Sequence, residues 1–313
     1  MINYIKIARL DHSIKQLFIL PGIFFAFVIV NNDNIIIFIQ EIILNLFLVL
    51  ISTCSIASAN YVINEWLDSD FDKFHPTKKL RPTVITCLKF KYVLFEYFIF
   101  ASLGLIFAYN TNLTILISEL SLLIMGLLYN IPPIRLKEYP FIDVLTESFN
   151  NAIRFLIGWF IVTDTLLPPA SIVLGYWMGG AFLMSMKRFA EYRMIQNKEI
   201  AGMYRKSFKF YSEKSLLLSS YFYSMLSIFF CGIFMLKYRI ELLLAIPFLC
   251  GIYCLYFNIS FKFDSSAQKP EKLFREKYLM LSVFIFICIV IFLMKCNISI
   301  LNKFLNTTFI SIN

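Results

Sequence analysis

Runs of apolar residues long enough to cross a bilayer recur along most of this 313-residue chain. A membrane-spanning helix needs about 20 consecutive residues that are mostly apolar. Segments of this kind cover residues 16–38, 40–63, 92–109, 112–130, 141–163, 170–187, 215–236, 240–258 and 279–296. Because backbone polar groups in lipid must be satisfied within their own segment, these runs predict helices. The sequence therefore predicts an all-α polytopic membrane protein, with about nine transmembrane helices in a single domain over residues 1–313.

Lysine and arginine are distributed unevenly between the two ends of the predicted helices. Of 29 such residues, 24 precede the first segment or fall in alternate connections, and the remainder are Arg154, Lys237, Arg239, Lys295 and Lys303. The positive-inside rule then places the N-terminus and the charged connections in the cytoplasm. We therefore expect an integral protein of the cytoplasmic (inner) membrane whose active site faces the cytoplasm. The net charge of +9 follows from this topology and gives no reason to expect nucleic-acid binding.

The stretch NEWLDSDFDKFHPTKKLRP, residues 64–82, concentrates charge just after the second apolar segment. Asn64, Asp68 and Asp72 are spaced four residues apart, so on a helix they face within about 80° of one another, whereas Asp70 faces away. Two carboxylates and an amide that converge in this way suit Mg²⁺, which is commonly held by one or two carboxylates and substrate phosphates. The alternative is a solvated acidic helix end.

The residues that follow this acidic stripe are basic. His75-Pro76 is expected to end the helix, since the residue before a proline leaves the helical region. Lys78 and Lys79 supply point charges for phosphate, and Arg81 supplies a planar guanidinium. The stretch as a whole therefore predicts a Mg²⁺–diphosphate site, with Asp68, Asp72, Lys78 and Arg81 as its catalytic residues. A topology-setting loop is the alternative, but it explains the basic residues and not the aspartates.

The fifth and sixth apolar segments carry further charges. Asp143, Glu147, Asn150 and Arg154 form one stripe by their spacing, and a charged residue at membrane depth must face protein, water or a ligand. We interpret the stripe as the wall of a polar cavity that receives an anionic substrate; the alternative is an internal network that only holds helices together. In the sixth segment, Lys187, Arg188 and Glu191 lie three or four residues apart and can converge, although a surface ion pair has the same spacing. Residues 188–214 are predicted to form a loop.

Taken together, these motifs resemble those of the UbiA superfamily of intramembrane prenyltransferases. The stripe at Asn64, Asp68 and Asp72, followed by HPTKKLRP, is similar to the first motif of that superfamily. YNIPPIRLK (129–137) resembles its element after the fourth helix, and Asp143 with Arg154 and Gly158 matches its fifth helix. The resemblance implies a nine-helix fold around a cytoplasm-facing polar cavity, and Mg²⁺ as cofactor.

One departure from that superfamily indicates a particular branch. A second aspartate-rich motif is usual near the sixth helix, but this chain has Lys187-Arg188-Phe189-Ala190-Glu191 there. This pattern, together with Arg9 and Lys15, is similar to the decaprenyl-phosphate phosphoribosyltransferase branch. The resemblance implies transfer of 5-phosphoribosyl from 5-phosphoribose diphosphate to a polyprenyl phosphate, for cell-surface polysaccharide synthesis. The substrate-binding residues that it implies are Lys15, Tyr129, Lys137, Asp143, Arg154, Lys187, Arg188, Glu191 and Arg205, with Asn64, Asp68 and Asp72 as metal ligands.

The number of phosphate groups favours the same branch. Phosphoribose diphosphate and a lipid phosphate present three separate phosphate groups, which call for one metal cluster and additional fixed cations. Two alternatives stay open at this point. One is a prenyltransferase that moves a prenyl group from a prenyl diphosphate to an aromatic or other small acceptor. The other is a transporter, which the nearly uncharged connections on the far side of the membrane disfavour. The sequence leaves the oligomeric state open.

Overall fold

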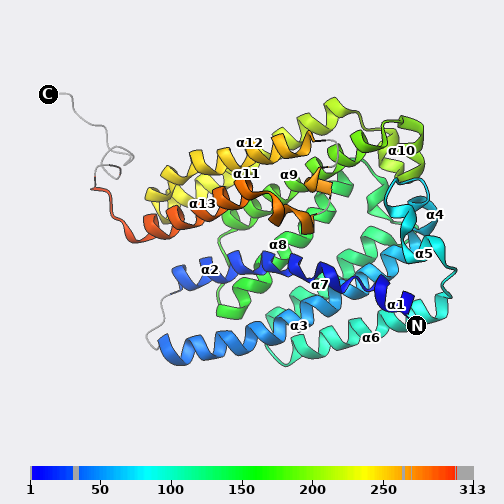
Figure 1. Ribbon diagram of the computed structural model, residues 1–313. Coiled ribbons are helices and arrows are strands. Elements are labelled where there is room, and N and C mark those ends of the chain that lie inside the picture. Colours follow the sequence, from blue (N-terminus) through cyan, green and yellow to red (C-terminus); the bar gives the residue numbers. More distant parts are fainter. Residues whose placement is uncertain (1, 31–34, 263–264, 269, 300, 302–313) are drawn as a thin grey trace.

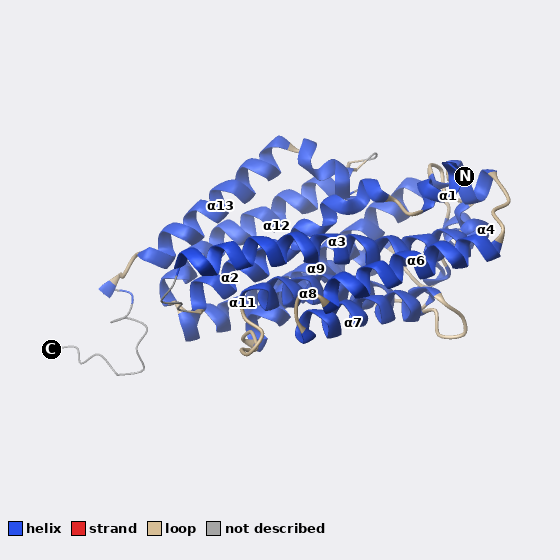
Figure 2. Cartoon of the chain, turned by 90° about the horizontal axis from the view of Figure 1, so that it is seen from below, coloured by secondary structure: helices blue, strands red, loops and turns tan. Residues whose placement is uncertain are grey.

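The computed structural model describes residues 2–30, 35–262, 265–268, 270–299 and 301, and within them it contains helices but no strand (Figures 1 and 2). The long helices run side by side along one axis in both views. They are α2 (Leu20–Ile29), α3 (Ile35–Leu67), α6 (Phe90–Tyr109), α7 (Leu113–Asn130), α8 (Ile142–Val162), α9 (Ala170–Ile195), α11 (Glu213–Tyr238), α12 (Ile246–Ser260) and α13 (Lys277–Lys295). The predicted all-α fold class is therefore confirmed.

Short helices gather at one end of the bundle. They are α1 (Ile2–Ile7), α4 (Ser69–Asp72), α5 (Pro82–Ile85) and α10 (Lys198–Tyr204), and Figure 1 shows them on the right. Segments of 3₁₀ helix make up the remaining helical elements of the described residues: η1 (Leu10–Ile19), η2 (Lys78–Leu80), η3 (Leu136–Glu138), η4 (Lys206–Lys209), η5 (Ile240–Ala245), η6 (Ser266–Gln268) and η7 (Pro270–Arg275). The charged connections predicted from the sequence lie at this end.

Several predicted boundaries were wrong in detail. Residues 188–214 are not a loop, because α9 continues to Ile195 and is followed by α10 and η4. The helix that carries the acidic stripe stops at Leu67, before His75-Pro76, and α4 restarts the helical path one residue later. The first predicted segment is divided: residues 16–19 lie in η1, residues 35–38 belong to α3, and residues 31–34 lie outside the described part.

Seven helical stretches are long and apolar enough to cross a membrane, among the described residues. They are Asn3–Ile29, Gln40–Leu67, Phe90–Tyr109, Leu113–Asn130, Glu213–Tyr238, Ile240–Ser260 and Lys277–Lys295. The chain is thus an integral membrane protein by the character of its helices. Helices α8 and α9 are long enough but carry the polar stripes that lower their hydropathy, so the count of nine spans stays a prediction.

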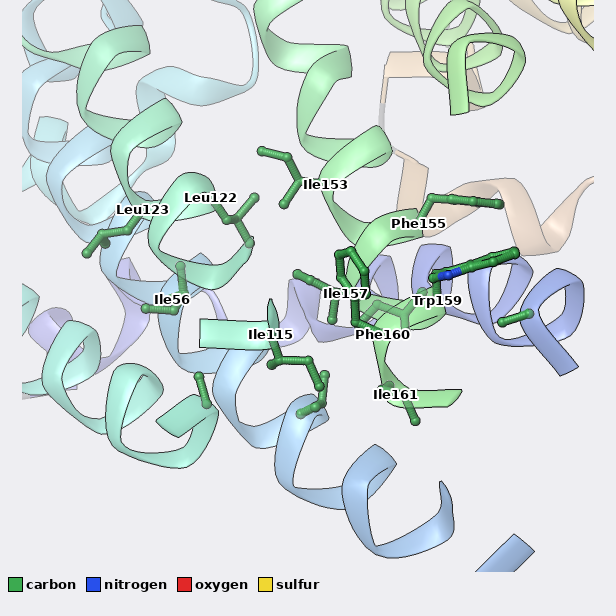
Figure 3. Close-up of a cluster of buried hydrophobic side chains, with 14 of the residues drawn as sticks. Ile56, Ile115, Leu122, Leu123, Ile153, Phe155, Ile157, Trp159, Phe160 and Ile161 are labelled. Carbon is green, nitrogen blue, oxygen red and sulfur yellow. The ribbon is translucent and has the colours of Figure 1, made fainter. Parts of the chain in front are cut away.

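Helix α8 occupies the middle of the bundle and anchors its main apolar core. Figure 3 shows its side chains Ile153, Ile157 and Phe160 among residues of α3 and α7. Both α7 and α9 pack against it, and so do α2 and η1. Apolar side chains on most of its circumference are expected for a helix enclosed by others. The polar residues of α8 therefore face protein or an internal cavity and not lipid.

Two glycines allow α2 and α8 to cross closely. A Cβ on Gly22 would lie 2.0 Å from the carbonyl oxygen of Phe155, and one on Gly158 would lie 2.0 Å from that of Ile19. Small residues at a crossing let two membrane helices approach backbone to backbone. This contact fixes the preceding turn, η1, beside the polar stripe of α8.

Local side-chain caps explain where several helices begin. Asn112 accepts a hydrogen bond from the backbone N–H of Ile115 at the start of α7, and Asn197 caps α10 in the same way. At the start of α11, Ser212 and Ser215 exchange hydrogen bonds in a capping box. Such caps satisfy backbone donors that a helix end leaves free, and each contributes about 1 kcal/mol.

Candidate functional site

A polar cavity of about 410 Å³ opens beneath the short helices α4 and α10. It is enclosed by η1, α3, α7, α8 and α9, with smaller contributions from α10 and α12. Most of the predicted site residues line it, and they are Lys15, Asn64, Asp68, Asp72, Lys78, Arg81, Tyr129, Glu147, Arg154, Lys187, Glu191 and Arg205. Residues from both halves of the chain thus meet in one cavity, as the sequence predicted. We call its end beside α4 and α10 the mouth.

Asp68 lies at the mouth and is surrounded by cations. Its Oδ1 accepts hydrogen bonds from Lys137 Nζ at 2.6 Å and from Arg135 Nη2 at 2.9 Å. Burial favours the neutral acid, but the charges of Lys137 and Arg135 outweigh it and hold the pKa of Asp68 below its ordinary value. Lys137 also donates to Asn64 Oδ1 at 3.0 Å. The first two members of the acidic stripe therefore meet at one ammonium group.

Asp72 pairs with Arg81 at the same end. Arg81 Nη1 lies 2.6 Å from Asp72 Oδ2, and Asp72 is almost fully buried. Burial raises the pKa of Asp72, and Arg81 opposes this without cancelling it. Asp70, by contrast, points to solvent and contacts Lys73 at 2.6 Å. The predicted division into two facing aspartates and one bystander is what the geometry shows.

Lys78 reaches across the mouth to α9. Its Nζ lies 2.8 Å from Glu191 Oε1 and also donates to the hydroxyl of Tyr204 on α10. Burial lowers the pKa of Lys78, against the opposing charge of Glu191. The basic turn after the acidic stripe is thereby tied to the sixth predicted segment, 113 residues away.

Arg188 is the centre of a buried network behind the cavity wall. It is fully buried, and it pairs with Asp143 at 3.3 Å, with Glu191 at 3.3 Å and with Glu147. Lys187, the preceding residue, lines the cavity and contacts Glu147 at 2.8 Å. Neither Arg188 nor Asp143 is among the residues that line the cavity in the described part of the chain. Their geometry is that of supporting residues, so their predicted contact with substrate stays a prediction.

Asp143 organises the segment that follows α10. Its carboxylate accepts hydrogen bonds from Tyr211 at 2.6 Å and Ser207 at 3.2 Å, and it lies 3.5 Å from Arg205. Arg205 in turn donates to the hydroxyl of Tyr129, at 3.3 Å. The α10–η4 segment is therefore held over the cavity by side chains that reach a single buried carboxylate.

Arg154 lies deeper in the cavity and has a different set of partners. Its Nε donates to Gln16 Oε1 at 2.8 Å, and its Nη1 donates to the backbone oxygen of Asn150 at 3.2 Å and to Asn151 Oδ1 at 3.5 Å. Among the described residues no carboxylate pairs with it, so the Glu147–Arg154 pair that a purely structural network would use is not formed. Lys15 stands nearby on η1, 5.5 Å from the ring centroid of Tyr61.

The sequence reasoning missed two contributors. Tyr204 binds Lys78 at the mouth, and Gln16 orients Arg154. Tyr204 stands in a charged connection, but no spacing rule links it to its partner. Gln16 is a buried amide in the first segment, and its polarity within an apolar run was the available signal.

The residues at the mouth fit a metal ion that enters together with a diphosphate. The described residues contain no group of three or more His, Cys, Asp or Glu side chains that could hold a metal by themselves. Asp68, Asp72 and the amide of Asn64 nevertheless all line the cavity. Mg²⁺ keeps several waters and commonly takes one or two protein carboxylates with substrate phosphates. The remaining ligands would come from substrate oxygens and water.

The fold and the cavity define an α-helical membrane protein with a phosphate-compatible charged site at one end. The model of the UbiA prenyltransferase family matches residues 19–287. This match covers most of the chain, and the chain therefore belongs to that family of membrane transferases.

Three individual proteins that resemble this chain share 30% or less of its aligned sequence. A protoheme IX farnesyltransferase from Geobacillus sp. (strain WCH70) is 30% identical over 156 residues, which are 47% of this chain and 48% of the relative. The matched segment thus spans about half the length of that relative. A UbiA homologue from Archaeoglobus fulgidus, bound to GPP and Mg²⁺, has a TM-score of 0.67 at 21% identity, over 94% of this chain and 100% of the homologue. A structure described for digeranylgeranylglyceryl phosphate synthase has a TM-score of 0.58 at 16% identity, over 93% and 96% of the two chains. These structural likenesses establish the fold.

Proposed function

We propose that this protein transfers 5-phosphoribosyl from 5-phosphoribose diphosphate to a polyprenyl phosphate in a Mg²⁺-dependent reaction. One observation carries the proposal: among the described residues, Asp68 and Asp72 are the aspartates that line the cavity, and they form one cluster at its mouth. The α9 side presents Lys187 to the cavity, beside Glu191. One cluster suits one metal-bound diphosphate. The additional cations suit the further phosphates that a phosphorylated sugar and a lipid phosphate bring.

The residues at the mouth take defined roles in this proposal. Asp68 and Asp72, with Asn64, would hold Mg²⁺, which when bound screens the charge of the donor's diphosphate and of the leaving pyrophosphate. Lys78 and Arg81 lie beside these carboxylates and neutralise the same leaving group. Each cation is paired with a carboxylate in the structure, so donor binding exchanges a carboxylate partner for a phosphate.

The chemical step balances without a protein base. The bond between the sugar C1 carbon and the pyrophosphate oxygen breaks, and its electron pair leaves with pyrophosphate. A lone pair on an acceptor phosphate oxygen forms the new C1–O bond from the opposite face, which inverts the configuration at C1. The acceptor phosphate is already an anion at neutral pH, so no proton has to be removed. The product is a polyprenyl-phosphate-linked 5-phosphoribose, which we propose as a sugar donor for cell-surface polysaccharide, made with the mouth facing the cytoplasm.

The test is a transfer assay with the purified full-length protein in lipid nanodiscs. Labelled 5-phosphoribose diphosphate and a polyprenyl phosphate are supplied with Mg²⁺, and the lipid fraction is examined for labelled phosphoribose. Formation of this product that stops on chelation of the metal supports the proposal. Absence of product with active protein, alongside turnover of a prenyl diphosphate, contradicts it.

Prenyl transfer is the second candidate, and the farnesyltransferase relative favours it. In that case the mouth would bind a prenyl diphosphate, and the acceptor would be an aromatic or other small molecule. The same assay with labelled prenyl diphosphate separates the two candidates, because each donor labels a different product.

A further inference from the structure

The deep end of the cavity contains a cation, the guanidinium of Arg154, that forms no ion pair with the described residues; the buried carboxyl of Glu119 acts on it from beyond ion-pair distance. We call this end the floor and define it by Lys15, Asn60, Tyr61, Asn151 and Arg154, which all line the cavity. Arg154 is 8% exposed, and its three hydrogen bonds all go to neutral oxygens. Its Nη2 group makes no hydrogen bond with the described residues. A guanidinium at membrane depth that has no direct ion-pair partner is stabilised further when an anionic ligand supplies one.

Two helices give the depth of this charge relative to the mouth. Helix α8 begins near the mouth, and Arg154 stands seven residues beyond Glu147, which corresponds to about 10 Å at 1.5 Å per residue. Helix α3 runs the other way, and Tyr61 precedes Asp68 by the same number of residues. Helix α3 therefore separates Tyr61 from the metal-ligand candidate Asp68, and helix α8 separates Arg154 from Glu147, by about 10 Å along the bundle axis.

The floor is also built to hold Arg154 in place. Gln16, almost fully buried, accepts from its Nε at 2.8 Å. Gln16 belongs to η1, which the Gly22–Gly158 crossing fixes against α8. On the other side, a Cβ at Gly180 would approach the amide nitrogen of Asn151 to 2.9 Å, so α9 packs directly on the residue that accepts from Nη1. The guanidinium is thus oriented before any ligand arrives, which lowers the entropic cost of binding.

We infer that Arg154, together with Lys15, which lines the same cavity, is the binding site for the phosphate of the lipid acceptor. This inference rests on the proposed function, because it assigns the two substrates of that reaction to opposite ends of one cavity. In-line displacement requires the entering oxygen on the face of C1 opposite the leaving group, about 3–3.5 Å from the carbon. With the leaving pyrophosphate at the mouth, the entering phosphate lies on the floor side. A phosphate at this depth also lets its polyprenyl tail start inside the bilayer core and not at the headgroups.

The floor does not suit a hydrocarbon. If the mouth held a prenyl diphosphate whose tail extended toward the floor, that tail would face the guanidinium of Arg154, which has no ion-pair partner among the described residues, unless the acceptor carried an anion there. The charge and depth of Arg154 therefore favour an anionic acceptor over a wholly apolar occupant.

The test is direct binding to the full-length protein in nanodiscs, and it needs no turnover. The probes are farnesyl monophosphate, farnesol as its uncharged counterpart, and Mg²⁺ with 5-phosphoribose diphosphate. We expect the wild-type protein to bind farnesyl monophosphate more tightly than farnesol. Arg154→Gln should weaken farnesyl monophosphate binding by about 10- to 100-fold, the size of a lost charge-assisted contact, and leave the other two probes unchanged. Arg154→Lys should restore part of the affinity.

Controls make the outcome decisive. Arg193→Gln removes an arginine from the partly exposed end of α9 and should change no affinity. Lys15→Gln tests the same floor if Arg154→Gln does not fold, and it should weaken farnesyl monophosphate alone. Equal binding of farnesyl monophosphate by the wild type and both floor variants, or a loss confined to 5-phosphoribose diphosphate, would overturn the inference. Failure of the proposed function would give a different result: the wild-type protein itself would neither bind nor use 5-phosphoribose diphosphate.

Discussion

The two ends of the cavity differ in how their charges are balanced. At the mouth, Asp68 is paired with Lys137 and Arg135, and Asp72 is paired with Arg81. At the floor, Arg154 has amide and backbone oxygens as its partners. A ligand at the mouth must therefore exchange partners within an existing set of ion pairs, whereas an anion at the floor would supply Arg154 with a direct ion-pair partner. In the proposed reaction, Mg²⁺ that enters together with the diphosphate would reduce the charge that the mouth has to accommodate.

The largest expected effect comes from removing a carboxylate at the mouth. Asp68→Ala should lower phosphoribosyl transfer by about 10²–10³-fold or more, because the metal and the donor diphosphate lose their ligand and Lys137 loses its partner. The measurement is the transfer rate of protein that still elutes as a folded species. Asp70→Ala is the matched control, since Asp70 contacts exposed Lys73 and should leave the rate unchanged. A rate close to wild type for Asp68→Ala would remove the metal assignment.

Removal of the buried cation behind the cavity wall should lower the stability of the folded protein. Arg188→Met leaves the carboxylates of Asp143, Glu147 and Glu191 without their shared buried cation. Removal of one partner from a buried ionic network typically destabilises by about 3–5 kcal/mol. Thermal unfolding in detergent measures this, with Arg193→Met as the control, because that side chain is 38% exposed and 3.8 Å from Glu213. Equal melting temperatures for the two variants would show that the network contributes little.

Some of the site was predictable from spacing alone. Asp68 and Asp72 were found because the helical path continues through α4, so the four-residue spacing still directs both toward the cavity. The same reasoning let Arg188 converge with Lys187 and Glu191, but among the described residues Lys187 and Glu191 line the cavity and Arg188 does not. Spacing alone cannot decide this, because adjacent residues of one helix can both line the cavity, as Asn150 and Asn151 do. Arg188 is held behind the wall by ion pairs that include Asp143 and Glu147 of the neighbouring helix, which local spacing does not encode.

Long-range partners limited the rest of the prediction. Lys78 meets Glu191 across 113 residues, and Gln16 meets Arg154 across 138 residues. Such pairs follow from how helices pack, which depends on close approaches such as that of Gly22 and Phe155. The fold class was accessible because apolar length alone predicts membrane helices. The number of spans stayed open because α8 and α9 carry the site's polar residues.

A smaller effect is expected from a substitution at the α2–α8 crossing, which holds η1 and thereby positions the floor. Gly158→Ala puts a Cβ against the backbone of Ile19, which cannot give way as a flexible side chain does. Overpacking of this kind typically destabilises by about 1–3 kcal/mol, and displacement of η1 should also weaken binding of farnesyl monophosphate. Gly251→Ala is the control, because a Cβ there meets nothing within 4 Å. Identical stability and binding for the two variants would contradict a positioning role for the α2–α8 crossing.

A similar effect on stability, with none on binding at the floor, should come from trimming the network behind the cavity wall without removing a charge. Tyr211→Phe deletes one hydrogen bond to Asp143 and one acceptor for the backbone N–H of Phe141, and leaves Arg188 and Ser207 on the carboxylate. A loss of about 1–3 kcal/mol in unfolding free energy is expected, since a buried carboxylate oxygen loses a donor. Tyr221→Phe, on the exposed face of α11, controls for removal of a tyrosine hydroxyl. Because Tyr211 does not line the cavity in the described part of the chain, binding of farnesyl monophosphate at the floor should not change, and a loss there would mean that the two ends of the cavity are coupled through the α10–η4 segment.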